Sequence, residues 1–261
     1  MTGGRIRGFR LLCASPAATA GFYRRAFGCR DEGAGPPGEV ALRLGAQAIA
    51  LRPAAGPAGT GFAGNESGFQ HLAIVVSDMR AAMERLAAMP GWTAISRDGP
   101  EILPPASGGV TAFKFRDPEG HPLELLQFPP GAIPRHWRAA PDDATFLGID
   151  HSAISVADTA RSLAHYAGLG FAAGRTQCNR GPEQARLDGL EGAVVEVTPL
   201  YAPDGGPPHL ELLRYRHPAP RPRPAADGGT AATELVIGVA GQARCLCLRD
   251  PDGHRLRLVP A

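Results

Sequence analysis

Two glutamates in this chain lie in segments where a carboxylate is costly. Glu124 lies within the apolar run 122–126 and Glu211 within the run 209–213. Such runs are typical of strands covered on both faces, where an unpaired carboxylate costs several kcal/mol. His71 and His151 occupy similar middle positions in apolar runs, and a buried imidazole needs a partner for each ring nitrogen.

A divalent cation would satisfy all four groups at once. It offsets the burial of both carboxylates and takes imidazole nitrogens as further ligands. Any one of these residues alone is better explained by a hydrogen bond or an arginine partner. However, His precedes Glu twice, by 53 and by 60 residues. The repeated order predicts a metal site whose ligands are His71, Glu124, His151 and Glu211.

An internal repeat positions these residues. Residues 70–78 and 150–158 share His, Ala, Ile, Val and Asp at a constant offset of 80. In each, β-favouring residues end at an Asp suited to N-capping, followed by apolar residues at helical spacing over 79–89 or 159–169. An earlier copy has a strand at 9–12, then Ser15 as a cap, and a helix to Phe27. Each copy predicts a strand followed by a helix.

Strand hairpins follow these helices. The turn 117–120 is repeated at 250–253, and both are followed by His and an apolar strand. Only residues 241–243 separate the second hairpin from the strand before it, which predicts a module without its helix. The chain therefore divides into four modules, which span residues 1–60, 66–130, 146–216 and 230–261. Segments rich in Pro, Gly and Ala join them.

Composition excludes several functional classes. None of the 261 residues form an apolar run approaching the ~20 residues of a bilayer helix, so no membrane association is expected. The 27 basic and 25 acidic residues are scattered, without the basic field that nucleic acid requires. Five cysteines without CxxC spacing favour a reducing cytoplasm. Lys114 is the only lysine among the basic residues, which we attribute to coding bias.

These features together resemble the vicinal oxygen chelate superfamily, which includes glyoxalase I, bleomycin-resistance proteins and extradiol dioxygenases. The resemblance covers essentially the whole chain. It implies an α+β fold of tandem β-α-β-β-β modules, in which two modules form a cupped mixed sheet of eight strands around one metal. Members with a glyoxalase-type site use His, Glu, His and Glu, the order found here.

The resemblance also predicts which modules pair. In module one the ligand positions fall on Gly8 and about Ala50, and module four has Arg257 where Glu would be. Glu234, the acidic candidate in module four, is interpreted as a salt-bridge partner of Arg257. Similar double-length chains pair inner with inner and outer with outer modules. We therefore expect modules two and three to hold the metal and modules one and four to form an empty cup.

The ligand set suits Ni, Zn, Co, Mn or Fe. The resemblance implies a glyoxalase-I-like lyase or isomerase that acts on a small oxygen-chelating substrate through an enediolate, with Glu124 or Glu211 as the base. Asn179 and Arg180, in the segment 175–184, are candidate substrate contacts or solvated loop residues, and the loop 98–108 is a candidate cover. His209 is interpreted as solvent-facing, and His121 and His254, like the remaining histidines, as hairpin or surface residues.

Two alternatives stay open. An Fe(II) extradiol-type dioxygenase would use two His and one carboxylate, but it needs an additional acid-base His, for which the sequence offers no convincing candidate. A non-enzymatic ligand-binding or drug-resistance protein would lack the metal quartet. The predicted partner is a small-molecule substrate, and the chain is expected to be a monomer or a homodimer.

Overall fold

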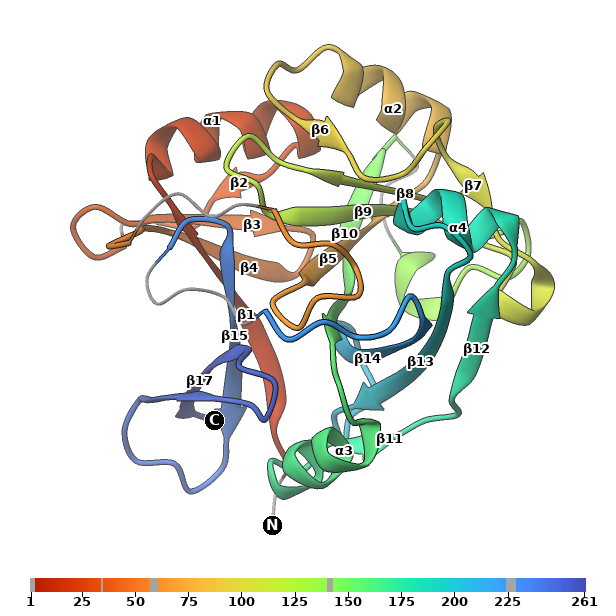
Figure 1. Ribbon diagram of the computed structural model, residues 1–261. Coiled ribbons are helices and arrows are strands. Elements are labelled where there is room, and N and C mark those ends of the chain that lie inside the picture. Colours follow the sequence, from red (N-terminus) through yellow and green to blue (C-terminus); the bar gives the residue numbers. More distant parts are fainter. Residues whose placement is uncertain (1–2, 34, 57–60, 140–142, 224–228) are drawn as a thin grey trace.

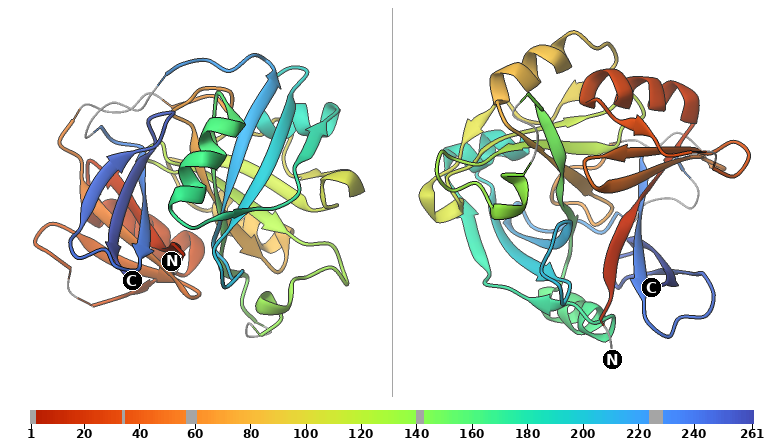
Figure 2. Two further views of the ribbon diagram at one scale, coloured as in Figure 1. Left: turned by 90° about the horizontal axis from the view of Figure 1, so that it is seen from below. Right: turned by 180° about the vertical axis from the view of Figure 1, so that it is seen from behind.

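The structure is a computed structural model, and it describes residues 3–33, 35–56, 61–139, 143–223 and 229–261. The described chain forms two curled mixed sheets that lie side by side (Figures 1 and 2). This confirms the predicted α+β class of tandem β-α-β-β-β modules. No helix in the described part of the chain is long and apolar enough to cross a membrane.

The outer sheet combines strands from both ends of the chain in the order β16-β17-β15-β1-β4-β3-β2. Helix α1 contacts β1, β3 and β4. The elements are β1 (Arg5–Cys13), α1 (Pro16–Phe27), β2 (Arg30–Asp31), β3 (Val40–Leu44), β4 (Gln47–Pro53), β15 (Ala232–Val239), β16 (Leu246–Arg249) and β17 (Arg255–Pro260). No helix lies between β15 and β16, as the short spacing predicted.

The inner sheet runs β11-β13-β14-β10-β5-β9-β8-β6, with β12 paired to β13 and β7 to β8, so it has ten strands rather than the expected eight. Its first half contains β5 (Gln70–Val76), α2 (Met79–Ala87), β6 (Thr93–Ala94), β7 (Glu101–Ile102), the 3-10 turn Pro105–Ser107, β8 (Thr111–Arg116) and β9 (Pro122–Gln127). The 3-10 turn Arg135–Trp137 leads to β10 (Phe146–Ser155), α3 (Thr159–Gly168), β11 (Ala172–Ala173), β12 (Gln177–Arg180), α4 (Pro182–Asp188), β13 (Val194–Tyr201) and β14 (His209–His217).

Local sequence explains where the helices begin. Ser15, Asp78 and Asp158 have extended backbones, and their side chains accept hydrogen bonds from the amides of Ala18, Ala81 and Arg161, three residues onward. Such N-caps satisfy amides that lack a partner in the first helical turn. Within each module the first and last strands then lie parallel: β1 with β4, β5 with β9, β10 with β14 and β15 with β17.

The two repeated turns connect the sheets in equivalent ways. Asp117 accepts a hydrogen bond from the Tyr23 hydroxyl at 3.1 Å, and Asp250 accepts one from Tyr166 at 3.0 Å. His121 Nε2 lies 3.0 Å from the Leu12 carbonyl, and His254 Nε2 lies 2.9 Å from the Ser155 carbonyl. Each turn therefore attaches one module to the helix and first strand of a module in the other sheet.

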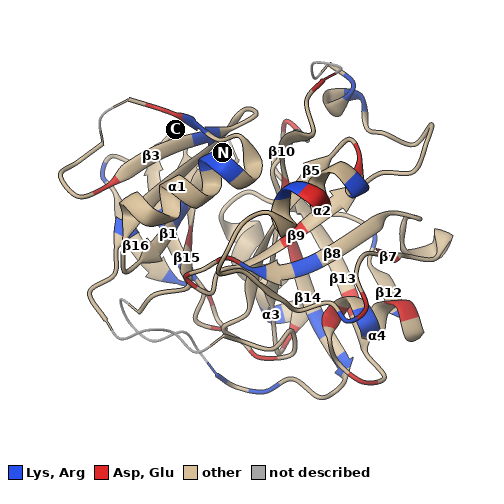
Figure 3. Cartoon of the chain, turned by 90° about the horizontal axis from the view of Figure 1, so that it is seen from above, with Lys and Arg blue, Asp and Glu red and all other residues tan. Residues whose placement is uncertain are grey.

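Charged residues of both signs are interspersed over the surface, for example along α2 and α4 (Figure 3). Most of the buried apolar side chains belong to one core that includes strands of both sheets. Phe27 of α1, for instance, lies 5.6 Å from Phe146 of β10 and 6.3 Å from Phe115 of β8, measured between ring centroids. The inner sheet is thereby held against the outer modules, with its concave side left for the site.

Candidate metal centre

The four predicted ligands lie on adjacent strands at the middle of the inner sheet and line one cavity: His71, Glu124, His151 and Glu211. Ala73 is the register partner of both Glu124 on β9 and His151 on β10. Ala153 is likewise the partner of His71 on β5 and Glu211 on β14. Residues in lateral register share a sheet face. Each set of register partners has an alanine on the central strand and a predicted ligand on either side, so all four ligands face the same cavity.

Three of the side chains approach one another closely. His71 Nε2 lies 2.7 Å from Glu124 Oε2, and His151 Nε2 lies 4.0 Å from the same oxygen. Possible ligand atoms of these three residues all lie within 4.8 Å of one another. Glu211 completes the group through Oε2, which lies 3.6 Å from His151 Nε2. The carboxylates differ in exposure, since the Glu124 side chain is 8% exposed and that of Glu211 is 20% exposed.

The geometry around His71 fits an ion. Neither ring nitrogen has a hydrogen-bond partner among the described residues, despite the short contact between Nε2 and Glu124. A buried imidazole without partners is unusual. Two ligand atoms bound to one ion at about 2.1 Å would lie about 3 Å apart when adjacent. The His71–Glu124 contact is close to that spacing, so both atoms are directed as they would be toward a shared cation.

Electrostatics keep the carboxylates ionised. Burial alone would raise the pKa of Glu124, but the charge of Lys114 and the contact with His71 outweigh it and lower this pKa to about 2. The pKa of Glu211 is also about 2, because His151 and His209 outweigh its burial. Burial would lower the pKa of His151, yet Glu211 and Asp150 raise it to about 9. Burial lowers the pKa of His71.

Asp150, which the sequence analysis did not single out, orients His151. Its Oδ2 lies 3.1 Å from His151 Nδ1, and its Oδ1 accepts a hydrogen bond of 3.1 Å from Trp137 Nε1. A carboxylate on the second ring nitrogen fixes the orientation of a ligating histidine and makes it more basic. The sequence signal available was an Asp immediately before His in an apolar strand. Trp137, from the segment between modules two and three, thus supports the site indirectly.

His209 was interpreted as solvent-facing, and this was wrong. Its side chain is 14% exposed, and Nε2 lies 3.4 Å from Glu211 Oε1. Nδ1 lies 3.8 Å from Asp150 Oδ2, so Asp150, His151 and His209 form a second group of possible ligands. The error has a simple cause: His209 opens β14, where sequence predicts exposure, but parallel pairing with β10 places it in register with His151.

Lys114 and Asp188 add a buried ion pair to the same cavity wall. Lys114 Nζ donates to Asp188 Oδ1 at 2.7 Å, and both side chains are almost fully buried. Burial would lower the pKa of Lys114, but Asp188 and Glu124 outweigh it and raise this pKa. On the neighbouring strand, Glu124 is the register partner of Lys114. A fixed positive charge therefore lies beside the carboxylates.

The cavity has a volume of about 210 Å³. The loop 98–108 contributes Leu103, Ser107 and Gly108 to its lining, in agreement with its predicted covering position. The segment 175–184 is not a loop: it forms β12 and the start of α4. Asn179 lines the cavity, whereas Arg180, its neighbour on β12, is exposed and does not. Strand alternation explains the difference.

Comparisons with known proteins agree with this architecture. A sequence model of the Glyoxalase/Bleomycin resistance protein/Dioxygenase superfamily matches residues 5–125. The sequence model covers 121 of the 261 residues, and it assigns this part of the chain to the superfamily. A comparison with curated proteins finds no match.

Solved structures show the superfamily fold over nearly the whole chain. Glyoxalase I from Zea mays is 19% identical with a TM-score of 0.65, and the match covers 98% of this chain and 92% of that one. A dioxygenase candidate from Bacillus subtilis subsp. subtilis str. 168 is 14% identical with a TM-score of 0.58, covering 98% and 84%. At these identities the likeness shows the fold alone.

Among the residues that the structure describes, the outer sheet has no comparable ligand set. Glu234 is paired with Arg10 at 2.9 Å and with Arg257 at 3.0 Å, so the salt bridge expected with Arg257 is present. Among the described residues, both groups of three or more possible ligands that could share an ion lie in the inner sheet. The guanidinium groups of Arg10 and Arg257 thus neutralise the charge of Glu234 in the outer sheet.

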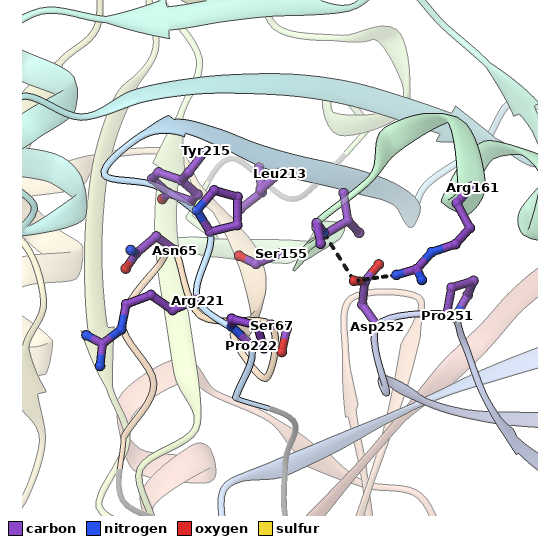
Figure 4. A pocket seen from close by; sticks show the side chains of 13 residues that line it. Asn65, Ser67, Ser155, Arg161, Leu213, Tyr215, Arg221, Pro222, Pro251 and Asp252 are labelled. Atoms are coloured by element: carbon purple, nitrogen blue, oxygen red, sulfur yellow. Dashed lines mark hydrogen bonds and ion pairs between the residues drawn. The ribbon is translucent and has the colours of Figure 1, made fainter.

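A second cavity, of about 320 Å³, lies beyond Leu213 and Tyr215, which also line the metal cavity (Figure 4). Several of its polar groups are already engaged. Asp252 accepts hydrogen bonds from Arg161 and from the Ala157 amide, drawn as dashed lines, and Ser155 donates to the Gly64 carbonyl. The larger cavity therefore offers little chemistry, and the reactive groups gather in the smaller one.

Proposed function

We propose that this protein is a metal-dependent enzyme and acts as a glyoxalase-I-like lyase or isomerase on a small oxygen-chelating substrate. The observation that carries the proposal is the convergence of His71, Glu124, His151 and Glu211 in one cavity, where the buried His71 Nδ1 has no hydrogen-bond partner among the described residues. Two imidazoles and two carboxylates fit Ni, Zn, Co, Mn or Fe without selecting among them. When bound, the ion would polarise a substrate carbonyl and stabilise developing negative charge.

The surroundings of the two glutamates divide their roles. Glu124 is the more buried, and Lys114 and His71 hold it ionised, which suits a permanent ligand. Glu211 is more exposed and lies beside the half-buried His209. We therefore assign Glu211 as the base that moves a proton between adjacent substrate carbons, with Glu124 as the second candidate. Both are ionised at neutral pH and able to accept a proton.

A specific observation favours the dioxygenase alternative. One group of possible ligands is His71, Glu124 and His151, two histidines and one carboxylate, as in non-haem Fe(II) oxygenases. His209, beside Glu211, provides the acid-base histidine that sequence alone did not identify. Oxygen uptake by Fe(II)-loaded protein with a catechol would support a dioxygenase. Isomerisation of a 2-oxoaldehyde thiol adduct without oxygen uptake would support the lyase or isomerase.

The test common to both enzymatic readings is metal analysis of purified protein. We expect one ion per chain in the wild type and less than about a tenth of that in His71→Ala and in His151→Ala, because each variant removes a ligand. His217→Ala is a matched control, since this exposed histidine lies outside the cavity. Full metal content in both ligand variants would refute the site. Wild-type protein without metal would favour a non-enzymatic ligand-binding protein.

A further inference from the structure

Lys114 is held in the wall of the metal cavity by groups from distant segments. The residue is 5% exposed. Its amide donates to Ser96 Oγ at 2.8 Å, and its ammonium donates to Asp188 at 2.7 Å. Asp188 receives a second hydrogen bond, of 2.7 Å, from Gln184 Nε2. The ammonium therefore has a fixed position at the boundary of the cavity rather than a mobile one.

The choice of lysine at this position is informative. All other basic residues of the chain are arginine, so coding bias alone would place arginine here too. A guanidinium is a broad planar group, whereas an ammonium is a compact point charge with three donors. The cavity measures about 210 Å³, and an ammonium leaves space in it for another molecule. The exception to the coding bias thus lies where a compact charge faces a cavity.

Two buried acceptors in the same wall have no donor. Gln184 Oε1 and Asn179 Oδ1 have no hydrogen-bond partner within the described ranges, and both residues line the cavity. Buried polar atoms are nearly always paired in folded proteins. These oxygens therefore point to a ligand that brings donors, such as hydroxyl groups. The lining also has an apolar part that includes Leu103, Val110 and Leu126.

We propose that Lys114 binds a carboxylate of the substrate and that Asn179 and Gln184 accept hydrogen bonds from its hydroxyls. The substrate class is then a small hydroxylated carboxylic acid, whose other oxygens would face an ion held by His71, Glu124, His151 and Glu211. This inference rests on the proposed function and extends it to specificity. Lys114 acts here by contact with substrate, and Asp188 is the residue that positions it.

The test compares two probes of one shape and different charge, glycerate and its neutral amide glyceramide. Co²⁺-loaded protein of measured metal content is titrated with each by calorimetry. Because Lys114→Met alone would leave the buried Asp188 carboxylate without its charged partner, the informative variant is the pair Lys114→Met with Asp188→Asn. Asp188→Asn alone keeps the ammonium, and Arg180→Met removes an exposed charge outside the cavity.

We expect the wild type and R180M to bind glycerate at least about tenfold more tightly than glyceramide, as a charge-assisted hydrogen bond predicts. D188N keeps the ammonium without its positioning carboxylate, so its preference should lie between that of the wild type and that of the double variant. In the double variant the preference should fall to less than about threefold while metal content stays at one ion. A preference retained in the double variant would assign it to the metal and overturn the inference. If metal-loaded wild type shows no preference for glycerate over glyceramide, the inference is overturned and the proposed function stays intact. If the wild type cannot hold metal, both the inference and the proposed function are refuted.

Discussion

At the scale of single residues, the two histidines of the centre are supported differently. His151 has Asp150 on its second nitrogen, and Trp137 holds Asp150 in turn. His71 Nδ1 has no hydrogen-bond partner within the described part of the chain. The orientation of His151 is therefore set by hydrogen bonds, whereas that of His71 depends on packing against neighbours such as Phe69, whose ring centroid lies 5.7 Å away.

Asp150→Asn should weaken metal binding about 10- to 100-fold without removing a ligand, because an amide orients His151 less firmly and adds no charge. Competition with a chromophoric chelator measures the affinity. Asp98→Asn is the control, since Asp98 is exposed and its positive φ of 63° is one that Asn adopts readily. Equal affinities of the two variants would contradict the role given to Asp150.

Metal affinity should depend on pH through His151. Its pKa of about 9 in the metal-free protein means that the ring is protonated at neutral pH, and the metal must displace that proton. Affinity should rise about tenfold per pH unit up to about pH 9 and then level off. Calorimetry in buffers of different ionisation enthalpy would count the released proton. A constant affinity between pH 7 and 9 would exclude a protonated His151.

At the scale of elements, the repeated turns join the two sheets. In the first turn, Asp117 Oδ2 lies 2.9 Å from His121 Nδ1, and both side chains are buried. Burial would lower the pKa of His121, but Asp117 outweighs it and raises this pKa. The turn sequence thus creates a short-range ion pair whose other contacts, with Tyr23 and the Leu12 carbonyl, cross to the outer sheet.

His121→Asn should reduce the free energy of unfolding by about 2 kcal/mol or more at low pH, because it removes a buried charged partner of Asp117. The raised pKa sets the direction: the stabilisation is fully present below the ordinary pKa of 6.5 and is lost as pH rises through the higher value in the folded protein. Urea unfolding at pH 6 and pH 9 should show a smaller difference in unfolding free energy between wild type and variant at pH 9. A larger difference at pH 9 would contradict the ion pair.

At the scale of the whole molecule, the proposed metal would link modules two and three. His71 and Glu124 come from one module, and His151 and Glu211 from the next. The antiparallel pairing of β5 with β10 also joins these two modules. Since a ligand that binds only the folded state adds stability, the ion would stabilise this junction.

Removal of metal with EDTA should therefore lower the melting temperature. At an ion concentration about 1,000 times Kd the loss is about 4 kcal/mol, or roughly 10 °C for a chain of this size. Differential scanning calorimetry of wild type and His151→Ala, each with and without chelator, separates this effect from damage to the fold. EDTA should leave the variant unchanged, and an equal shift in both proteins would argue against a metal at His151.

The repeat and the charged residues in apolar strands were visible in the sequence, because both are local patterns. Helix starts at Ser15, Asp78 and Asp158 were predicted from N-capping residues and apolar spacing, and the missing helix of module four was predicted from the short distance between its strands. The sequence also singled out His71 and Glu124 as costly to bury. Their chemical role as metal ligands remains our proposal, which the geometry supports.

Contacts between modules were decided only by the tertiary structure. Lys114 and Asp188 are 74 positions apart, and His209 meets Asp150 and His151 only through the register of β10 and β14. A local pattern reports whether a residue prefers burial, but its neighbours depend on strand order, register and helix packing. For that reason the sequence identified residues whose burial required a partner, whereas folding determined which partners they obtained.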